Sequence, residues 1–304
     1  MNREKINKGV LSKYGFIAAM LAYPAVMFLM FYIAVNVNSV VMAFENINMD
    51  GTRTFIKFDN FIAFFEEFGK EGSIVVKSIV NSLKMWSINL VICMPLYIAF
   101  SYYLFKKWLG HSVIRVIIML PSIISSFIVC LVFKKFVEVA LPSIMKDMFG
   151  IDKFPNLITD SDYLFGTSLF YMIWVSFSTS LIVYSNAMKE IDDEIFEAAK
   201  MDGVGIFQEL FYIILPLIFP TISTFLVLGV SGIFVTAGPI VAFYEYSAPA
   251  EAYNLGYYIT QRTMRLGEVD YPQLAAIGII ITLVMAPVTF GVKALTDRLD
   301  PRSN

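Results

Sequence analysis

The sequence predicts an all-α, polytopic membrane protein with six transmembrane helices. Apolar residues occupy 58% of its 304 positions, and charged residues occupy only 16%. An ordinary soluble domain has about 25% charged residues. The apolar residues also form long uninterrupted runs. A hydrocarbon core about 30 Å thick is crossed by about 20 helical residues, so the length of these runs favours membrane spans.

Six runs are long enough to be spans, and none of them contains an Asp, Glu, Lys, Arg or His residue. They cover residues 16–43, 86–105, 117–133, 164–187, 217–244 and 274–292. Lipid offers no hydrogen-bond partner to the backbone, so each run is expected to be helical. The first run exceeds the 7 to 15 residues of a cleavable signal sequence and is expected to be retained as a span. Every run except the fourth contains proline, which neighbouring membrane helices can accommodate.

The basic residues predict how the chain is oriented. They gather in an N-terminal tail (1–15), in the short connection 106–115 and in a C-terminal tail (293–304). Because Lys and Arg are enriched in cytoplasmic loops, both tails are expected in the cytoplasm. The region between them, 16–292, is predicted to be one membrane domain in the cell membrane.

The polar segment at residues 189–216 has the features of a short helix, a glycine turn and a second helix. Asp192 is expected to cap the first helix, with Ile191 and Phe196 forming a hydrophobic staple. Gly203 can adopt the left-handed conformation that ends a helix.

One face of this first helix is expected to rest on the membrane domain. Ile191, Ile195 and Ala198 follow a single stripe, and the acidic residues lie away from it. An ordinary helical loop at the cytoplasmic surface would have the same pattern, so this pattern does not assign a function by itself.

The same segment contains a specific motif. It reads Glu-Ala-Ala, three residues, Gly, nine residues, Ile, one residue, Leu-Pro. The motif residues are Glu197, Ala198, Ala199, Gly203, Ile213, Leu215 and Pro216, with Asp202 before the glycine.

This motif resembles the signature of the inner-membrane permeases of ABC importers. The resemblance extends from the second run to the end of the chain. It is closest to the carbohydrate group, and in particular to the first of the two permeases in importers of the maltose and glycerol-phosphate type. The loop after Gly238 and Pro239 departs from the family pattern, because relatives often carry a longer glycine run there.

The resemblance implies a type I importer fold in which the loop 189–216 docks on a separate cytoplasmic ATPase dimer. It also implies a homologous second permease and an extracytoplasmic sugar-binding protein or lipoprotein as partners. The sequence contains no Gly-x-x-x-x-Gly-Lys-Ser/Thr motif, so ATP and Mg²⁺ are expected on the partner ATPase and no cofactor on this chain.

Several other classes of function are not indicated. The chain has one histidine, His111, and its two cysteines, Cys93 and Cys130, lie inside apolar runs. No metal site and no catalytic residue are therefore expected. The net charge is −2 and there is no basic block, so nucleic acid is not expected as a partner. Membrane lipid is expected around the protein.

A substrate is expected to contact the spans that flank the motif. The resemblance implies sugar contacts near mid-membrane, and hydroxyl, aromatic and small residues there could provide them. The candidates are Tyr171, Trp174, Ser176, Thr179, Ser180, Gly229, Gly232 and Thr236. Ser176, Thr179 and Ser180 are spaced to share one helix face. Serine and threonine also bond to their own helix, and small residues also mark helix packing, so a structural role is the alternative.

The uncharged spans favour a neutral sugar, most simply an oligosaccharide, because an anionic substrate would normally meet Arg or Lys. An ion- or proton-coupled secondary carrier is the main alternative function. Such carriers keep ionisable residues inside their spans, and this sequence has none there. A receptor or assembly factor that moves no solute is a third alternative.

Overall fold

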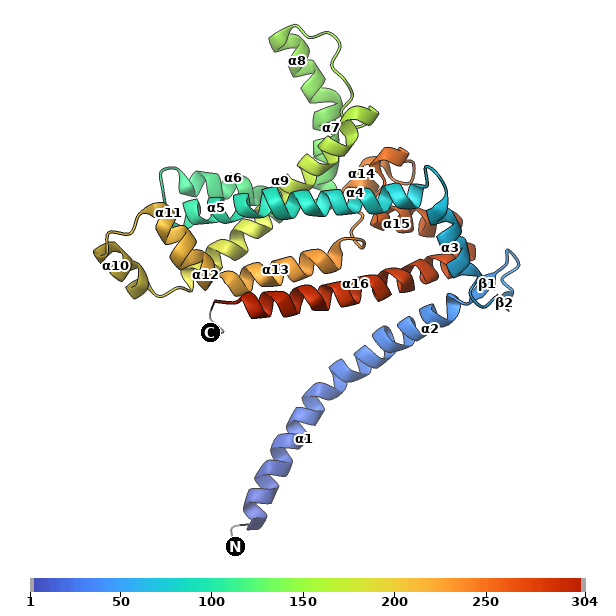
Figure 1. The fold of residues 1–304 in the computed structure, drawn as a ribbon, viewed down its shortest axis with the longest axis horizontal. Coiled ribbons are helices and arrows are strands. Elements are labelled where there is room, and N and C mark those ends of the chain that lie inside the picture. The colour runs from blue at the N-terminus through green and yellow to red at the C-terminus, as the bar shows by residue number, and fades with distance from the viewer. Residues whose placement is uncertain (1–2, 302–304) are drawn as a thin grey trace. The chain divides into compact units, whose positions relative to one another are not determined.

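The computed structural model describes residues 3–301, with side chains from residue 13 onward. The described chain is almost entirely helical (Figure 1). It divides into two compact units. The first contains the residues up to Glu66 together with Leu266–Ile280, and the second contains Glu67–Arg265 and the residues from Ile281 onward.

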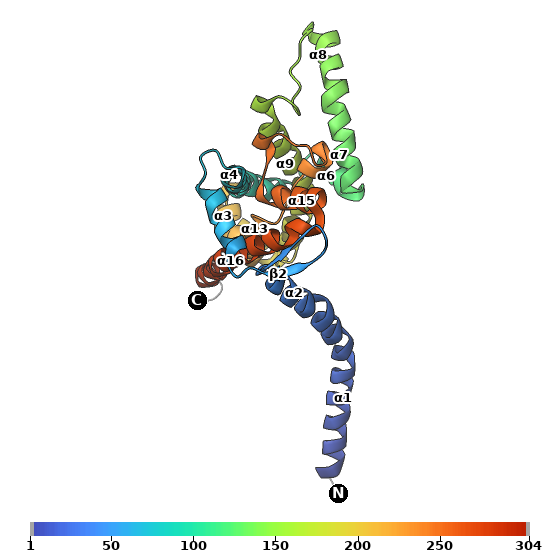
Figure 2. The ribbon, with the colours of Figure 1, turned by 90° about the vertical axis from the view of Figure 1, so that its right-hand side faces the viewer.

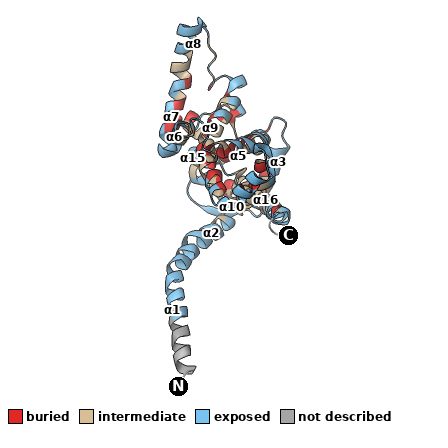
Figure 3. Cartoon of the chain, turned by 90° about the vertical axis from the view of Figure 1, so that its left-hand side faces the viewer, coloured by how far each residue is buried: buried red, intermediate tan, exposed pale blue. Residues whose placement is uncertain are grey.

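The first unit begins with a long apolar helix formed by α1 (Arg3–Met27), η1 (Phe28–Ile33) and α2 (Ala34–Met42). Its residues 13–38 are all exposed, as the pale blue ribbon in Figure 3 shows. An apolar helix with side chains this exposed requires lipid or another subunit around it. The predicted first span is therefore helical, while the extreme ends of both predicted tails lie outside the described residues.

A small hairpin in the first unit was not predicted. Strands β1 (Glu45–Ile47) and β2 (Arg53–Phe55) pair antiparallel, with Glu45 opposite Phe55. In the turn, Asp50 Oδ1 accepts hydrogen bonds from the hydroxyl and amide of Thr52, which lower the pKa of this carboxyl. Strands of three residues are too short to show an alternating pattern in the sequence.

The remaining helices follow in chain order, and η marks π and 3₁₀ segments. They are α3 (Asp59–Gly69), α4 (Ile74–Ile88), η2 (Asn89–Cys93), α5 (Met94–Phe105), α6 (His111–Ile123), α7 (Ser126–Lys135), η3 (Phe136–Ala140), α8 (Leu141–Phe149), α9 (Ser161–Lys189), α10 (Asp193–Met201), α11 (Ile206–Gln208), η4 (Glu209–Ile214), α12 (Leu215–Leu217), α13 (Phe219–Gly232), α14 (Ile240–Tyr244), η5 (Ala250–Ala252), α15 (Leu255–Leu266), η6 (Gly267–Asp270) and α16 (Tyr271–Leu299).

The described helices provide between four and six membrane spans. Four are long and apolar enough by themselves: Lys13–Met42, Ile74–Phe105, Ser161–Lys189 and Leu255–Leu299. Two bent pairs bring the number to six. His111–Ile123 meets Ser126–Phe149 at 106°, and Ile206–Leu217 meets Phe219–Gly232 at 67°. The predicted class, a helical membrane protein, is confirmed.

Two predicted spans are not single straight helices. The run 117–133 is interrupted at Ile124, whose backbone is extended (φ −90°, ψ 147°). Beyond this break α7, η3 and α8 continue as one helix (Figure 2). The run 217–244 ends as a helix at Gly232, and Gly238 has a φ of +61°. Hydropathy alone cannot detect such breaks, because both sides of each break are equally apolar.

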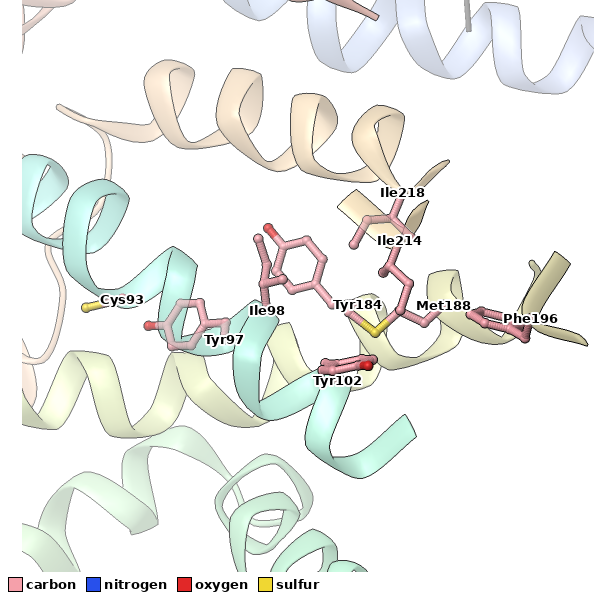
Figure 4. Close-up of a cluster of buried hydrophobic side chains, with 9 residues drawn as sticks. All are labelled: Cys93, Tyr97, Ile98, Tyr102, Tyr184, Met188, Phe196, Ile214 and Ile218. Atoms are coloured by element: carbon pink, nitrogen blue, oxygen red, sulfur yellow. The ribbon is translucent and has the colours of Figure 1, made fainter. Parts of the chain in front are cut away.

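The main core of the second unit joins the spans to the segment around α10. In Figure 4, buried side chains from η2, α5, α9 and α10, from the helix at residues 206–217 and from Ile218 directly after it form this cluster. Tyr102, Met188 and Phe196 are among its members, and Met188 is fully buried. Helices α5 and α9 run side by side along it (Figure 1). The core therefore positions the signature segment directly on two spans.

Candidate functional site

The signature segment folds as predicted, with α10 followed by a glycine turn and a second helix from Ile206 to Leu217. Gly203 has a φ of +72°. The amide of Val204 donates to the carbonyl of Ala199 at 3.0 Å, and the amide of Gly203 donates to that of Lys200 at 3.2 Å. These two bonds are those of a Schellman ending.

The start of α10 agrees only in part with the prediction. Asp192 has the extended backbone of an N-cap residue, but its carboxylate makes no capping hydrogen bond. Ile191 packs on the same cluster as Phe196, which is consistent with the predicted staple.

The predicted buried stripe of α10 is wrong. Phe196 and Ala199 are the buried residues, whereas Ile195 and Ala198 are exposed. The ring of Phe196 packs on Phe105, with 5.4 Å between the centroids. Burying this large ring determines the rotation of the helix, because it removes more apolar area from water than the smaller side chains could.

This rotation directs most of the signature outward. Glu197, Ala198, Asp202 and Gly203 are exposed, and Ala199 is the residue that faces the core. Met201 and Phe207, on either side of the turn, are 88% and 76% exposed. The turn thus offers an exposed surface with apolar and acidic residues. Ile213, Leu215 and Pro216 are half-buried in the second helix.

An ion pair that the sequence did not reveal holds the second helix to α5. Lys106 Nζ lies 2.5 Å from Glu209 Oε1 and 2.8 Å from Oε2, and the Glu209 side chain is only 9% exposed. The hydroxyl of Tyr102 donates to Glu209 Oε1 at 3.2 Å. Lys106 also lies 5.6 Å from the ring centroid of Phe196, so this pair contacts both helices of the signature segment. The only sequence signal was an acidic residue inside an otherwise apolar stretch.

A cavity of about 300 Å³ lies among α4, α9, α13 and the start of α15. Four of the predicted substrate residues line it: Ser176, Gly229, Gly232 and Thr236. Trp86, Asn89 and Asn254 line it too, although the sequence did not single them out. None of its lining residues is charged.

The polar groups of this cavity differ in whether they already form hydrogen bonds with other residues. Asn254 Oδ1 accepts a hydrogen bond from the amide of Tyr257 at 2.8 Å. The hydroxyls of Ser176 and Thr236 make no hydrogen bond to another described residue. These two hydroxyls are therefore available to a ligand.

Glycines determine the shape of this cavity. A Cβ added at Gly229 would lie 3.3 Å from Nε1 of Trp86, so the indole packs directly over the glycine. A Cβ added at Gly256 would lie 2.5 Å from the backbone carbon of Thr236. Helix α15 therefore supports the segment that carries Thr236 by direct contact with its backbone.

A second cavity, of about 310 Å³, shares Ser176 and Met172 with the first and includes Tyr171 and Gly238. Tyr171 is 5% exposed, and its hydroxyl donates to the carbonyl of Ser126 at 3.3 Å. Its ring lies 5.3 Å from that of Phe243, so much of this side chain contributes to packing.

The three remaining predicted residues line neither cavity. Trp174 packs beside Phe133 with 6.1 Å between ring centroids, Thr179 is exposed and Ser180 is buried. The shared helix face of Ser176, Thr179 and Ser180 consequently does not direct three hydroxyls into one cavity. Among the described residues no group of His, Cys, Asp and Glu side chains could hold a metal.

Residues 72–304 match the family of binding-protein-dependent transport system inner membrane components, and the chain belongs to this family. It is accordingly a non-catalytic, multi-pass permease of the inner membrane, and the ATPase of such a system is a separate subunit. The membership favours an importer over an ion-coupled carrier.

This chain spans less than two thirds of the length of the first MalF relative and about two thirds of YurN. The maltose/maltodextrin transport system permease protein MalF of Klebsiella aerogenes is 26% identical over 206 residues, which cover 62% of this chain but 39% of MalF. The probable ABC transporter permease protein YurN of Bacillus subtilis is 24% identical over 202 residues, covering 64% of this chain and 66% of YurN.

Solved structures share the fold over nearly the whole chain. A chain of a bacterial ABC transporter involved in the import of the acidic polysaccharide alginate has a TM-score of 0.77 and 21% identity, covering 97% of this chain and 99% of that one. A bacterial alginate ABC transporter in complex with an alginate pentasaccharide-bound periplasmic protein has a TM-score of 0.73 at 20% identity, with 97% and 96% covered.

Proposed function

We propose that this chain is the permease subunit of an ABC importer that brings a neutral oligosaccharide into the bacterial cytoplasm. The observation that carries the proposal is the lining of the cavity around Ser176 and Thr236, which has free hydroxyls, amide side chains and the Trp86 indole but no charge. Hydroxyls and amides exchange hydrogen bonds with sugar hydroxyls, and an aromatic ring can cover an apolar sugar face.

The relatives support a carbohydrate substrate, but they differ in the charge of that carbohydrate. The relative from Klebsiella is named for maltose and maltodextrin, which are neutral sugars. The structurally similar transporter is described as importing an acidic polysaccharide. The uncharged cavity of this chain favours the neutral class, because an acidic sugar without a cation would lose hydration without compensation.

Uptake by the reconstituted complex tests this assignment. The complex contains this chain, a homologous second permease, an ATPase dimer and an extracytoplasmic binding protein, and it is offered a neutral malto-oligosaccharide beside an alginate oligosaccharide. We expect ATP-dependent uptake of the neutral compound, lowered up to about tenfold by Ser176→Ala or Thr236→Ala, since each hydrogen bond contributes about 0.5 to 1.5 kcal/mol. Thr179→Ala, outside the cavity, is the matched control. Preference for the alginate compound would refute the neutral substrate, and uptake driven by a proton gradient would refute the importer.

The proposal assigns the turn at Gly203 to the groove of the ATPase, with Glu197, Ala198, Ala199, Asp202 and the second helix up to Pro216 completing the coupling element. Its support is the exposed surface of Met201, Asp202 and Phe207 on one side and the anchored face of Phe196 on the other. ATPase closure would then move α10, and α10 would move α5 and α9. As part of the same proposal, both tails lie in the cytoplasm.

Replacing Gly203 by valine is expected to leave the complex assembled but to abolish substrate-stimulated ATP hydrolysis. A Cβ at this position meets no atom within 4 Å, so the cost arises from the left-handed backbone alone. That cost is about 1 to 2 kcal/mol or more for a β-branched residue. The control variant Gly203→Asn should retain coupling, because asparagine tolerates this backbone conformation.

The measurements are ATPase rate with and without loaded binding protein, and subunit composition by size-exclusion chromatography. Full stimulation in an assembled Gly203→Val complex would contradict the coupling role.

A further inference from the structure

A third cleft, separate from the two cavities described above, lies where α6, α9 and the end of α5 meet. It has a volume of about 100 Å³, and its polar part is lined by Arg115, Ser185, Asn186 and Lys189. Its remaining lining residues are apolar and include Met119 and Leu181. All of these residues belong to the second unit.

Neither cation of this cleft forms an ion pair with an acidic side chain that the structure describes. The Arg115 side chain is half-buried and forms no ion pair or hydrogen bond with another described residue. The Lys189 ammonium donates to Asn186 Oδ1 at 3.4 Å. No carboxylate is among the lining residues, in contrast to nearby Lys106, which is paired with Glu209. Two uncompensated cations beside one cleft attract an anion.

Ser185 gives an independent indication of a ligand. This residue is 5% exposed, and its hydroxyl makes no hydrogen bond to another described residue. Its oxygen is not among the enclosed, unpartnered side-chain atoms, so it is reached from the cleft and is free to form a hydrogen bond there. Because Ser185 lines the cleft between the two cations and the apolar part, an oxygen atom of a bound molecule would supply the missing partner.

The order of residues along the helices indicates what kind of anion fits. On α9, Leu181, Ser185 and Lys189 lie on successive turns, so the lining changes from apolar to cationic over about 12 Å. Met119 and Arg115 repeat this order on α6 over about 6 Å. A soluble phosphate ion would use only the cationic end, whereas a phospholipid has a charged headgroup and apolar chains in this same order.

We propose that this cleft binds the phosphodiester headgroup of an anionic phospholipid. Arg115 and Lys189 contact the phosphate oxygens, Ser185 donates to one of them, and the first part of an acyl chain lies along Met119 and Leu181. The lipid would link α6 to the end of α9, directly before α10. We assign this lipid to the cytoplasmic leaflet, and that assignment rests on the proposed function. The lipid site itself does not depend on the proposed function.

The test measures lipid bound to the intact complex by native mass spectrometry, after delipidation and titration with phosphatidylglycerol or phosphatidylcholine. We expect phosphatidylglycerol to bind preferentially and Arg115→Gln with Lys189→Gln to weaken it about 25-fold, since each cation contributes about fivefold. The matched control is Lys107→Gln with Arg298→Gln, which removes the same charges outside the cleft and should change binding less than twofold. The pair Arg115→Lys with Lys189→Arg preserves the charges and should retain most of the affinity.

Three results would overturn the proposal: equal binding of both lipids, equal losses in the two double-glutamine variants, or displacement of phosphatidylglycerol by inorganic phosphate at the same site. Lipid binding is measured without any sugar, so failure of malto-oligosaccharide uptake would refute the proposed substrate and leave this result unaffected.

Discussion

Replacing Gly256 with alanine is expected to reduce uptake by the reconstituted complex to near the background rate. The added Cβ would lie 2.5 Å from the carbon and 2.6 Å from the oxygen of Thr236, and 2.7 Å from the nitrogen of Ala237. All three are backbone atoms, which cannot move aside as the end of a flexible side chain can. Overpacking of this kind costs about 3 kcal/mol. The segment carrying Thr236 would have to shift, and the cavity with it.

The matched control for this prediction is Gly166→Ala in α9, where a Cβ meets no atom within 4 Å. Uptake and the midpoint of thermal unfolding are measured for both variants. We expect a lower midpoint and little uptake for Gly256→Ala, and values near those of the unchanged protein for Gly166→Ala. If the two variants behave alike, α15 does not support the cavity in the way described.

Glu209→Ala is expected to destabilise the permease by about 3 kcal/mol, because it leaves the Lys106 ammonium unpaired in a largely buried position. It also removes the acceptor for Tyr102. The second helix of the coupling segment would lose its attachment to α5. We therefore expect ATP hydrolysis to continue while uptake per ATP falls.

The exposed pair Lys293–Asp297, with both side chains 59% exposed, provides the control. Asp297→Ala should cost about 0.5 kcal/mol or less, because exposed ion pairs contribute little. The double variant Lys106→Met with Glu209→Leu removes both charges and should recover stability, since an apolar replacement of a buried pair is often neutral. Unfolding midpoints and the ratio of uptake to ATP hydrolysed are the measurements. A similar loss from Glu209→Ala and Asp297→Ala would show that the buried pair is not an anchor.

Local information in the sequence was enough for the apolar helices and for the signature, although not for the breaks inside two of the predicted spans. Each apolar run carries its own evidence of burial in lipid, and the residues from Glu197 to Pro216 are contiguous, so no folding is needed to recognise them. The left-handed turn at Gly203 was predictable for the same reason. The rotation of α10 was not, because it depends on the contact of Phe196 with Phe105, which is distant in the sequence.

The cavity was only partly predictable. Ser176, Gly229, Gly232 and Thr236 were expected from their residue types and positions, and they do line one cavity. Whether they bind a sugar stays a prediction. Trp86 and Asn254 belong to segments that are far apart in the sequence, and nothing in either segment indicates that they meet.

The sequence by itself determined that this chain is a helical membrane permease, which apolar runs form its helices and where its glycine turn lies. These properties follow from hydropathy, glycine conformation and a contiguous motif, all of which act over a few residues. Only the tertiary structure decided the pairing of Lys106 with Glu209, the breaks at Ile124 and Gly232, and the close contact of Gly256 with Thr236. The physical reason is that charge pairing and steric contact depend on distances between atoms that are far apart in the chain.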